Sequence, residues 1–203
     1  MIRFAFNRLL LFLFPFLLYS CGSDFVNEDL SIFRYNESAG FSSLDPAFAK
    51  DQSSIWVANQ IFDGLVELDS SLNVQPSIAH SWKISEDAKG YTFTLREDVY
   101  FHAHERFVSE EERKVRAQDF VYSFNRLTDK SVASPGAWVM NNVAFYEAVD
   151  DTTLFIRLKT PFPPFLGLLT MPYCSVVPQE IVENTNFRDA PVGSGPFHFQ
   201  YWK

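Results

Sequence analysis

The sequence predicts a mixed α/β fold in which a small antiparallel sheet carries a helix. The first observation is a set of short segments whose apolar residues alternate with polar ones, the pattern of half-buried strands. The second is the segment 116–129, whose apolar residues recur at helical spacing on one face. The third is an aromatic content of 17% over 203 residues, enough for a substantial core. The alternating segments are "LVELD", "HSWKIS", "YTFTLR" and "LFIRLK".

The first twenty residues predict an export signal. Two arginines precede the apolar run Leu9–Tyr19, which is shorter than the roughly 20 residues of a membrane-spanning helix and contains Pro15. The stretch "LLYSC" is similar to the lipobox of bacterial lipoproteins, so we expect Cys21 to begin the mature chain and to carry a lipid anchor. A plain secretory signal followed by a chance cysteine is the alternative.

The part of the chain after this signal is acidic. Residues 1–21 contain two of the 17 basic residues and none of the 25 acidic ones, which leaves a formal charge of −10 for residues 22–203. This balance disfavours nucleic acid as a partner. Cys174 is the one other cysteine, so residues 22–203 cannot form a disulfide among themselves, and no cysteine-based metal site is predicted.

The predicted elements before the sheet are a strand, a loop and a helix. "SIFRYN", residues 31–36, predicts a strand, and a loop around an Asp-Pro pair follows it. From Ser53 the apolar residues fall at helical spacing, with Ser53 or Ser54 as the N-cap and Gly64 as the stop.

The predicted elements after the sheet are two short helices and a strand. The proline-rich "TPFPPFLGLL" leads to one helix, and "VVPQEIVE" starts another with Pro178 near its first turn. Gly193 and Gly195 in "PVGSGPFHFQYWK" are predicted to be turn residues rather than a ligand cradle. Residues 197–202 alternate as in a strand.

Six stretches of the chain match one known family in the same order. They are "LDPAFAKDQSSIWVANQIFDGLVELD", "PSIAHSWKIS", "YTFTLREDVYFH", "RAQDFVYSFNRLTD", "AVDDTTLFIRLKTPFPPFLGLLTMPYCSVVPQEIVE" and "PVGSGPFHF". Together they resemble the bacterial extracellular solute-binding proteins of family 5, which serve peptide and related ABC importers. Each stretch alone is a weak signal, but the ordered set covers almost all of residues 44–203.

This resemblance implies a two-lobed Venus-flytrap fold, the type II periplasmic-binding-protein class, with an inserted α+β subdomain. The expected content of the chain is an incomplete lobe I. The signal peptide occupies residues 1–20, the first part of lobe I residues 21–63, the inserted subdomain residues 64–178, and the truncated re-entry into lobe I residues 179–203. The second lobe is expected to be absent.

The function that the resemblance implies is substrate binding for an ABC importer by a lipoprotein that takes oligo- or dipeptides and closes around them by hinge motion. The implied partners are a peptide ligand, ABC permease subunits and the membrane that holds the anchor; the complete protein is expected to be a monomer without a cofactor. The expected location is the cell envelope, on the periplasmic side of the inner membrane or at the outer membrane or cell surface. The alternatives are a surface lipoprotein with an adhesive, sensory or chaperone-like role and a nonfunctional truncated fragment.

One candidate ligand-binding segment precedes the first helix. The residues that line the cleft in peptide-binding relatives correspond here to a short polar loop, whose backbone groups can pair with an extended peptide. A solvated loop before a helix would have the same composition. The candidate residues are Lys50, Asp51, Gln52 and Ser53.

Another candidate segment is "SVASPGAWV", which matches a subdomain loop that reaches the cleft in relatives. Close peptide binders often have an aromatic residue where this chain has Gly136, so one ligand contact is expected to differ. Trp138 could supply a replacement surface, or it could pack in the core. In the helix 116–129, Arg116 stands where relatives usually carry a capping Thr, and loss of such a cap costs about 1 kcal/mol.

No enzymatic chemistry is predicted, because the sequence contains no GxSxG, HExxH or GxxxxGK[ST] pattern. His102 and His104 would lie on the same side of a strand in "FHAHERF", but two imidazoles do not make a closed metal site. We therefore expect no bound metal, and a metal or haem carrier that depends on this pair is the weakest alternative.

Overall fold

The computed structural model describes residues 32–38 and 40–202, so the predicted signal and the lipidation site Cys21 lie outside the described residues. The chain divides after Asn36 into two compact units, and each is described by itself.

In the first unit, the strand predicted for "SIFRYN" is not found among residues 32–36, where the rings of Phe33 and Tyr35 stack with centroids 6.4 Å apart. Alternation alone does not make a strand, because a strand needs a hydrogen-bonded neighbour. All ladders formed by the described residues lie between residues 66 and 158.

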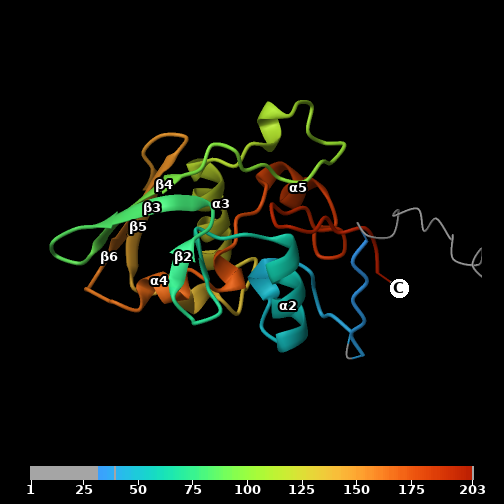
Figure 1. The fold of residues 1–203 in the computed structure, drawn as a ribbon, viewed down its shortest axis with the longest axis horizontal. Helices are drawn as coiled ribbons and strands as arrows, with labels where there is room; N and C mark the ends of the chain where they lie inside the picture. The colour runs from blue at the N-terminus through green and yellow to red at the C-terminus, as the bar shows by residue number, and fades with distance from the viewer. Residues whose placement is uncertain (1–31, 39, 203) are drawn as a thin grey trace, which may run out of the picture. The chain divides into compact units, whose positions relative to one another are not determined.

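The second unit, from Glu37 onward, contains short helices and strands (Figure 1). No helix among the described residues is long and apolar enough to cross a membrane. The strands are β1 (Val66–Leu68), β2 (Val74–Pro76), β3 (Ala79–Ile84), β4 (Gly90–Leu95), β5 (Val143–Ala148) and β6 (Thr153–Leu158). The helices are α2 (Gln52–Ile61), α3 (Ala117–Thr128), α4 (Phe165–Leu168) and α5 (Gln179–Asn184), and the 3₁₀ turns are η3 (Pro46–Phe48), η4 (Glu111–Arg113), η5 (Ala137–Met140) and η6 (Pro172–Cys174).

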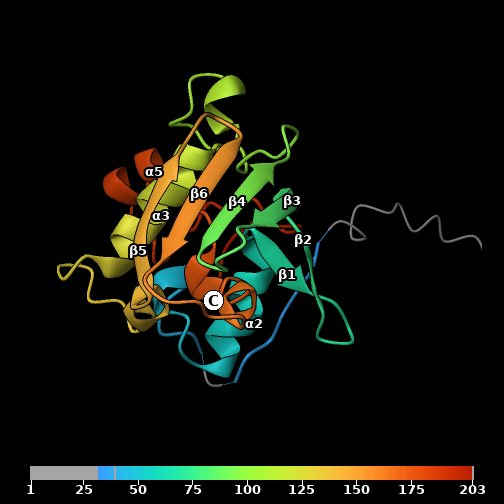
Figure 2. The same cartoon turned by 90° about the vertical axis from the view of Figure 1, so that its left-hand side faces the viewer.

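The sheet is antiparallel with the strand order β3-β4-β6-β5, and β1 pairs separately with β2 (Figure 2). The four alternating segments of the sequence are β1, β3, β4 and β6, so these predictions are confirmed. β5 was not predicted because a register shift between Val143 and Phe145 breaks its alternation and because only one of its six residues is buried. β2 has only three residues, too few for a periodic signal.

The sheet and α3 share one core. Alternate residues of β4 and β6 are buried, and α3 presents an apolar face to the sheet, as the spacing of residues 116–129 predicts. Burial of each such large side chain contributes about 1.5–3 kcal/mol. The fully buried members are Tyr91, Phe93, Leu154, Ile156, Leu158, Phe120, Phe124 and Leu127.

The helix α2 begins and ends at residues other than those predicted. Its N-cap is Asp51, not Ser53 or Ser54, and it ends at Ile61 before Gly64 is reached. The cause of the early end is a distant turn, because the Gly195 N–H donates to the Ile61 carbonyl at 2.8 Å and the Phe197 N–H donates to the Gln60 carbonyl at 2.9 Å. These bonds satisfy two of the carbonyls that a helix end leaves without partners.

The same contact with the end of α2 explains why glycine occupies positions 193 and 195 of "GSG". A Cβ on Gly193 would lie 2.0 Å from the Ile61 oxygen, and a Cβ on Gly195 would lie 2.6 Å from the Ile61 carbonyl carbon. Residues 196–202 are not a strand, contrary to the prediction, since their first hydrogen bond goes to the end of α2 and not to a ladder. The turn therefore terminates a helix.

The first turn of α3 depends on Asp119. Its carboxylate accepts the backbone N–H of the N-cap residue Arg116 at 2.7 Å, whereas the Arg116 side chain has no acceptor to offer in return. The guanidinium instead pairs with Glu111 at 2.6 Å and with Asp151 at 3.5 Å. Both pairs reach exposed carboxylates and are worth little.

We predict that Arg116→Thr stabilises the protein by about 0.5–1 kcal/mol, because the Thr hydroxyl can accept the Asp119 N–H and complete the reciprocal cap. Arg116→Val is the matched control, since it has a similar shape and loses the same ion pairs. The measurement is the urea midpoint of all three proteins. Equal midpoints for the Thr and Val variants would show that the cap contributes nothing.

We predict that Asp119 makes stability fall as the pH rises. Burial, with the charges of Glu180 and Asp151, raises the pKa of Asp119 to about 6, while the hydrogen bond from Arg116 opposes the rise. The folded state then holds the extra proton between pH 4 and 6, so ionisation costs stability on the order of 2 kcal/mol above that window.

The test compares urea unfolding of Asp119→Asn and wild type at pH 4.5 and 7.5. The variant keeps an acceptor for Arg116 and should lose this part of the pH dependence. Asp189→Asn, which removes an exposed carboxylate, is the control and should retain it. The same pH dependence in all three proteins would contradict the prediction.

Candidate functional site

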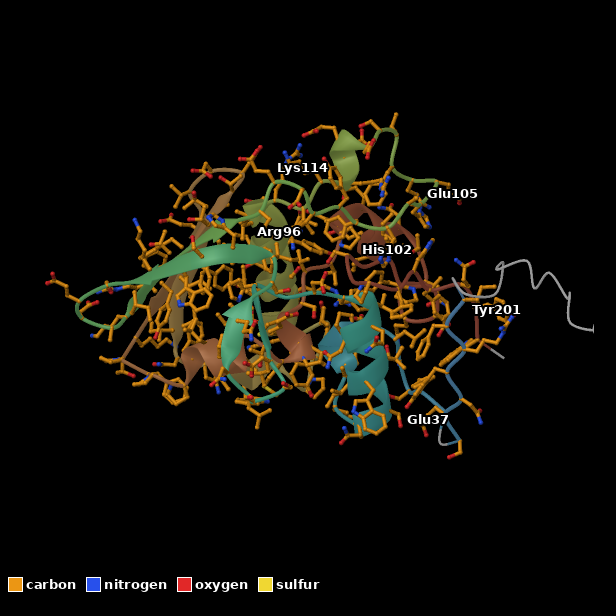
Figure 3. The ribbon with its side chains drawn as sticks, viewed as in Figure 1. Glu37, Arg96, His102, Glu105, Lys114 and Tyr201 are labelled. Atoms are coloured by element: carbon orange, nitrogen blue, oxygen red, sulfur yellow. The ribbon has the colours of Figure 1, made fainter. Side chains whose placement is uncertain are left out.

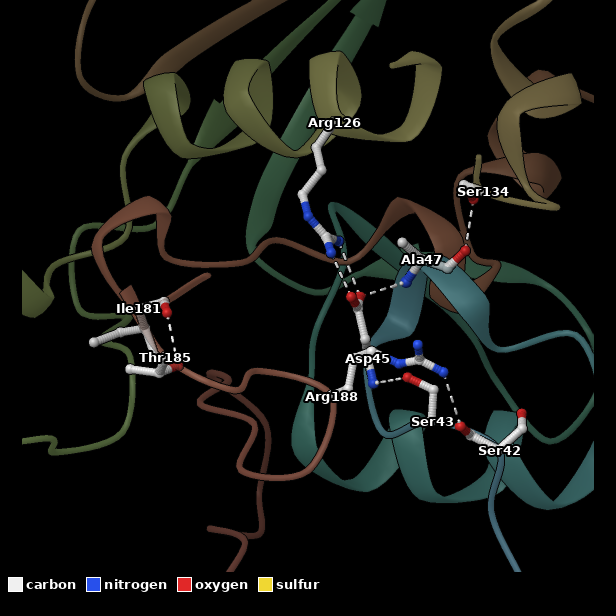
Figure 4. A network of polar contacts seen from close by, with 9 residues as sticks. All are labelled: Ser42, Ser43, Asp45, Ala47, Arg126, Ser134, Ile181, Thr185 and Arg188. Atoms are coloured by element: carbon white, nitrogen blue, oxygen red, sulfur yellow. Dashed lines mark hydrogen bonds and ion pairs between the residues drawn. The ribbon is translucent and has the colours of Figure 1, made fainter. Parts of the chain in front are cut away.

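A buried ion pair joins the loop before α2 to α3. The Arg126 guanidinium donates hydrogen bonds to both carboxylate oxygens of Asp45, and the Nη1–Oδ1 distance is 2.9 Å (Figure 4). Asp45 is 1% exposed and the Arg126 side chain 13%. Two charges removed from water to this extent are favourable only when they are closely paired.

The same carboxylate organises the 3₁₀ turn η3. Asp45 Oδ1 accepts the Ala47 N–H at 3.0 Å, and the Ala47 carbonyl accepts the buried Ser134 hydroxyl at 2.5 Å (Figure 4). Ser134 Oγ also accepts the Gly136 N–H at 3.0 Å. The Lys50 N–H donates to the Phe48 carbonyl at 2.8 Å, so the two candidate segments, the loop at 50–53 and the loop around Gly136, are tied to one short turn.

The candidate residues Lys50, Asp51 and Gln52 are exposed, and Ser53 is partly buried. Asp51 caps α2, because its Oδ1 accepts the Ser54 N–H at 2.9 Å and its Oδ2 accepts the Ser54 hydroxyl at 3.1 Å. These bonds, led by the one from the Ser54 backbone, hold the pKa of Asp51 below its ordinary value, so its carboxylate stays ionised. A fixed negative charge therefore marks this loop.

Gly136 packs directly against an aromatic ring that the sequence did not single out. A Cβ at position 136 would lie 2.3 Å from Cγ and 2.4 Å from Cδ1 of Tyr173, which belongs to η6. The Tyr173 side chain is partly buried. Burial, with a contribution from the Asp51 charge, raises the pKa of Tyr173. Tyr173 thus packs on Gly136 from η6, within the electrostatic influence of Asp51.

Trp138 lies in η5, two residues beyond Gly136, and is 48% exposed. This exposure excludes the fully buried packing role considered for it. The structure therefore joins the loop around Gly136 to η3 through Ser134 and to η6 through Tyr173, and it leaves the Trp138 ring in contact with solvent. The one signal in the sequence for Tyr173 is indirect: Gly136 leaves a space that another side chain must fill.

A different cavity, of about 370 Å³, lies near the "GSG" turn. Arg96 and His102, labelled in Figure 3, both line it, together with Asp63 and Ser194. Burial raises the pKa of Asp63, and the Glu67 charge adds to this effect. The Ser194 hydroxyl and Arg96 oppose it, although Ser194 Oγ forms no hydrogen bond of ordinary geometry.

His102 holds the "GSG" turn in place. Its backbone N–H donates to the Gly193 carbonyl at 2.7 Å, and its Nε2 lies 2.8 Å from the Gly195 carbonyl, which requires a proton on Nε2. Burial chiefly lowers the pKa of His102, and the charges of His198 and Arg113 lower it further. A neutral His102 that donates to the turn is the consistent state.

The structure does not pair His102 with His104 as metal ligands. Residues 101–104 are not a strand, and His104 Nδ1 accepts the Arg106 N–H at 3.2 Å. Within residues 32–38 and 40–202, no group of three or more His, Cys, Asp or Glu side chains could hold a metal ion. Cys174 is fully buried, and burial raises its thiol pKa to about 12, which makes it an unreactive core residue.

Comparison with known proteins gives a consistent set of relatives. The sequence profile of the bacterial extracellular solute-binding proteins, family 5 middle region, matches residues 73–203. The glutathione-binding protein GsiB of Escherichia coli O1:K1 is 30% identical over 166 residues, which make up 81% of this chain and 31% of that protein. The chain thus spans about a third of the length of the curated relatives it matches.

Solved structures agree with this result. The periplasmic binding protein DppA from Helicobacter pylori, in complex with the peptide STSA, is 32% identical with a TM-score of 0.71, over 80% of this chain and 35% of that one. NikZ from Campylobacter jejuni, in complex with Ni(L-His), is 27% identical with a TM-score of 0.69, over 81% of this chain and 32% of that one. The predicted fold class, an incomplete portion of an α/β periplasmic-binding-protein fold, is confirmed.

We predict that Asp45→Asn destabilises the protein by about 3 kcal/mol, because it leaves the buried Arg126 guanidinium without a counter-charge. The matched control is Asp87→Asn, which breaks the exposed Arg157–Asp87 pair, whose side chains are 35% and 46% exposed. That control should cost less than about 1 kcal/mol. Urea unfolding measures both losses, and similar values for the two variants would refute the special importance of Asp45.

Proposed function

The chain belongs to the bacterial extracellular solute-binding proteins of family 5, and we propose that it forms one wall of the ligand cleft of a peptide-binding lipoprotein that serves an ABC importer. Members of this family are binding proteins for transport and not enzymes, as the lack of catalytic motifs in the sequence predicts. The peptide as ligand, the permease as partner and the lipid anchor on Cys21 are parts of this proposal.

The observation that carries the proposal is the convergence of the two candidate segments. Gly136 is 83 or more positions from the loop Lys50–Ser53 in the sequence, yet both segments are tied to η3, since the Lys50 N–H donates to the Phe48 carbonyl and the Ser134 hydroxyl donates to the Ala47 carbonyl. An exposed loop with backbone N–H groups at the start of a helix suits an extended peptide, because main-chain pairing does not depend on the ligand's side chains. DppA from Helicobacter pylori, a similar structure, holds a peptide.

The proposed lobe organisation has support in the same contacts. If residues 21–63 and 179–203 belong to lobe I and residues 64–178 to the inserted subdomain, then the Asp45–Arg126 pair and the Ser134–Ala47 bond both cross the boundary between them. The two segments of lobe I would be joined to each other where the "GSG" turn meets the end of α2. Lobe I and the subdomain would then present a common wall to the ligand.

The test is an NMR titration of ¹⁵N-labelled chain with the peptide Ala-Ala-Ala. We expect chemical-shift changes concentrated at residues 50–54, 134–138 and 172–174, with a dissociation constant on the order of millimolar because one wall supplies part of the contacts. Changes concentrated around Asp63 and Arg96, or no changes at all, would count against the proposal.

A pair of variants tests the main-chain pairing. Gln52→Pro removes the N–H of the first residue of α2, a position that tolerates proline and follows the extended Asp51. Gln52→Ala removes the side chain and keeps this N–H. Weaker binding by the proline variant alone supports pairing through the backbone, whereas equal binding by both variants contradicts it.

A further inference from the structure

Tyr173 occupies the space that a side chain at position 136 would need. Its Cγ and Cδ1 atoms lie 2.3 and 2.4 Å from the position of a Cβ on Gly136, distances that no pair of such atoms can adopt. The loop around Gly136 and the turn η6 therefore share one volume, which holds one ring. In this chain η6 supplies the ring.

The turn that carries Tyr173 packs against η3, which ends two residues before the candidate loop. The turn η6 packs against η3 and against α2, whose first residues follow Asp51. The charge of Asp51 acts on the Tyr173 hydroxyl, and the ring is only partly buried. The proposed wall thus contains both an aromatic surface on η6 and an ionised carboxylate at the start of α2.

This combination attracts cations. The face of an aromatic ring has a negative potential, and a nearby carboxylate adds a full negative charge and hydrogen-bond acceptors. Asp51 is exposed, and no ion pair among the described residues involves its carboxylate. Its two bonds to Ser54 leave a lone pair on each oxygen for a ligand.

We infer that Tyr173 is a specificity-determining residue of the proposed cleft and that, together with Asp51, it selects a ligand with a positively charged group. The inference rests on the proposed function for the existence of the cleft. The group that fits is an ammonium or guanidinium, as in a lysine or arginine side chain. The Tyr173 ring, which lies against Gly136, supplies the contact surface for this charged group. Asp51, the N-cap of α2, supplies the counter-charge.

The probes are two capped tripeptides that differ in one charge, acetyl-Ala-Lys-Ala-amide and the same peptide with norleucine in place of lysine. Each is titrated into the ¹⁵N-labelled full chain at low salt. We expect the lysine peptide to bind about three- to fivefold more tightly, with its shift changes at Asp51, Gly136 and Tyr173. Added salt should remove the difference, because an exposed charge is screened.

Three variants assign the preference to the two residues. Asp51→Asn keeps an acceptor for the Ser54 N–H and should abolish the preference for lysine. Tyr173→Phe keeps the ring and should retain most of it, whereas Tyr173→Ser should lose most of it. An unchanged preference in Asp51→Asn, or in Tyr173→Ser, would overturn the inference.

Moving the ring tests the shared volume. Gly136→Tyr alone should destabilise the protein through collision with Tyr173, and the double variant Gly136→Tyr with Tyr173→Ser should recover stability. A tolerated Gly136→Tyr in the presence of Tyr173 would refute the shared volume. Failure of both peptides to bind anywhere would reject the proposed function, whereas equal binding of both at the expected residues would reject only the selection of charge.

Discussion

The ion pair between Asp45 and Arg126 is the interaction on which the candidate site depends. It joins residues 81 positions apart, and both partners are largely withdrawn from water. The carboxylate also accepts the Ala47 N–H, so it fixes the turn η3 as well as the guanidinium. Because η3 leads directly to Lys50 and Asp51, this pair connects the candidate loop to α3.

The position of α2 is determined at both of its ends. At its start Asp51 accepts two bonds from Ser54, and at its end Gly195 and Phe197 donate to the last carbonyls. A helix of ten residues is about 15 Å long, so the "GSG" turn acts at a distance from the loop whose helix it terminates. His102 in turn holds the Gly193 and Gly195 carbonyls. The proposed cleft wall is therefore supported by residues that take no part in it.

Periodicity predicted the elements whose burial is regular. β4, β6 and α3 alternate or repeat cleanly because each presents one face to a common core. Prediction failed where partners decide the structure. Residues 32–36 and 197–202 alternate but are not strands, and β5 is a strand although its bulge disrupts the alternation. The end of α2 was missed because it is set by residues more than a hundred positions away.

The candidate site shows the same division between local and distant causes. Resemblance pointed to the loop 50–53 and to Gly136, and the structure ties both to η3, but neither composition nor spacing could indicate Tyr173. The capping role of Asp51 was assigned to the neighbouring serines, because Ser and Asp are equally good N-caps and the sequence offers three of them within residues 51–54. Only the backbone, extended at Asp51, distinguishes among them.

The relation between Gly136 and Tyr173 changes what a missing aromatic residue means. Considered alone, glycine at position 136 indicates a lost ligand contact. In the structure the Tyr173 ring fills the space beside Gly136, so a side chain at position 136 would collide with it. The ring stands on η6, and the charge of Asp51 contributes to the raised pKa of its hydroxyl. Ligand preference at this wall should then depend on the Tyr173 ring and on the charge of Asp51 together, because one offers a contact surface and the other a counter-charge.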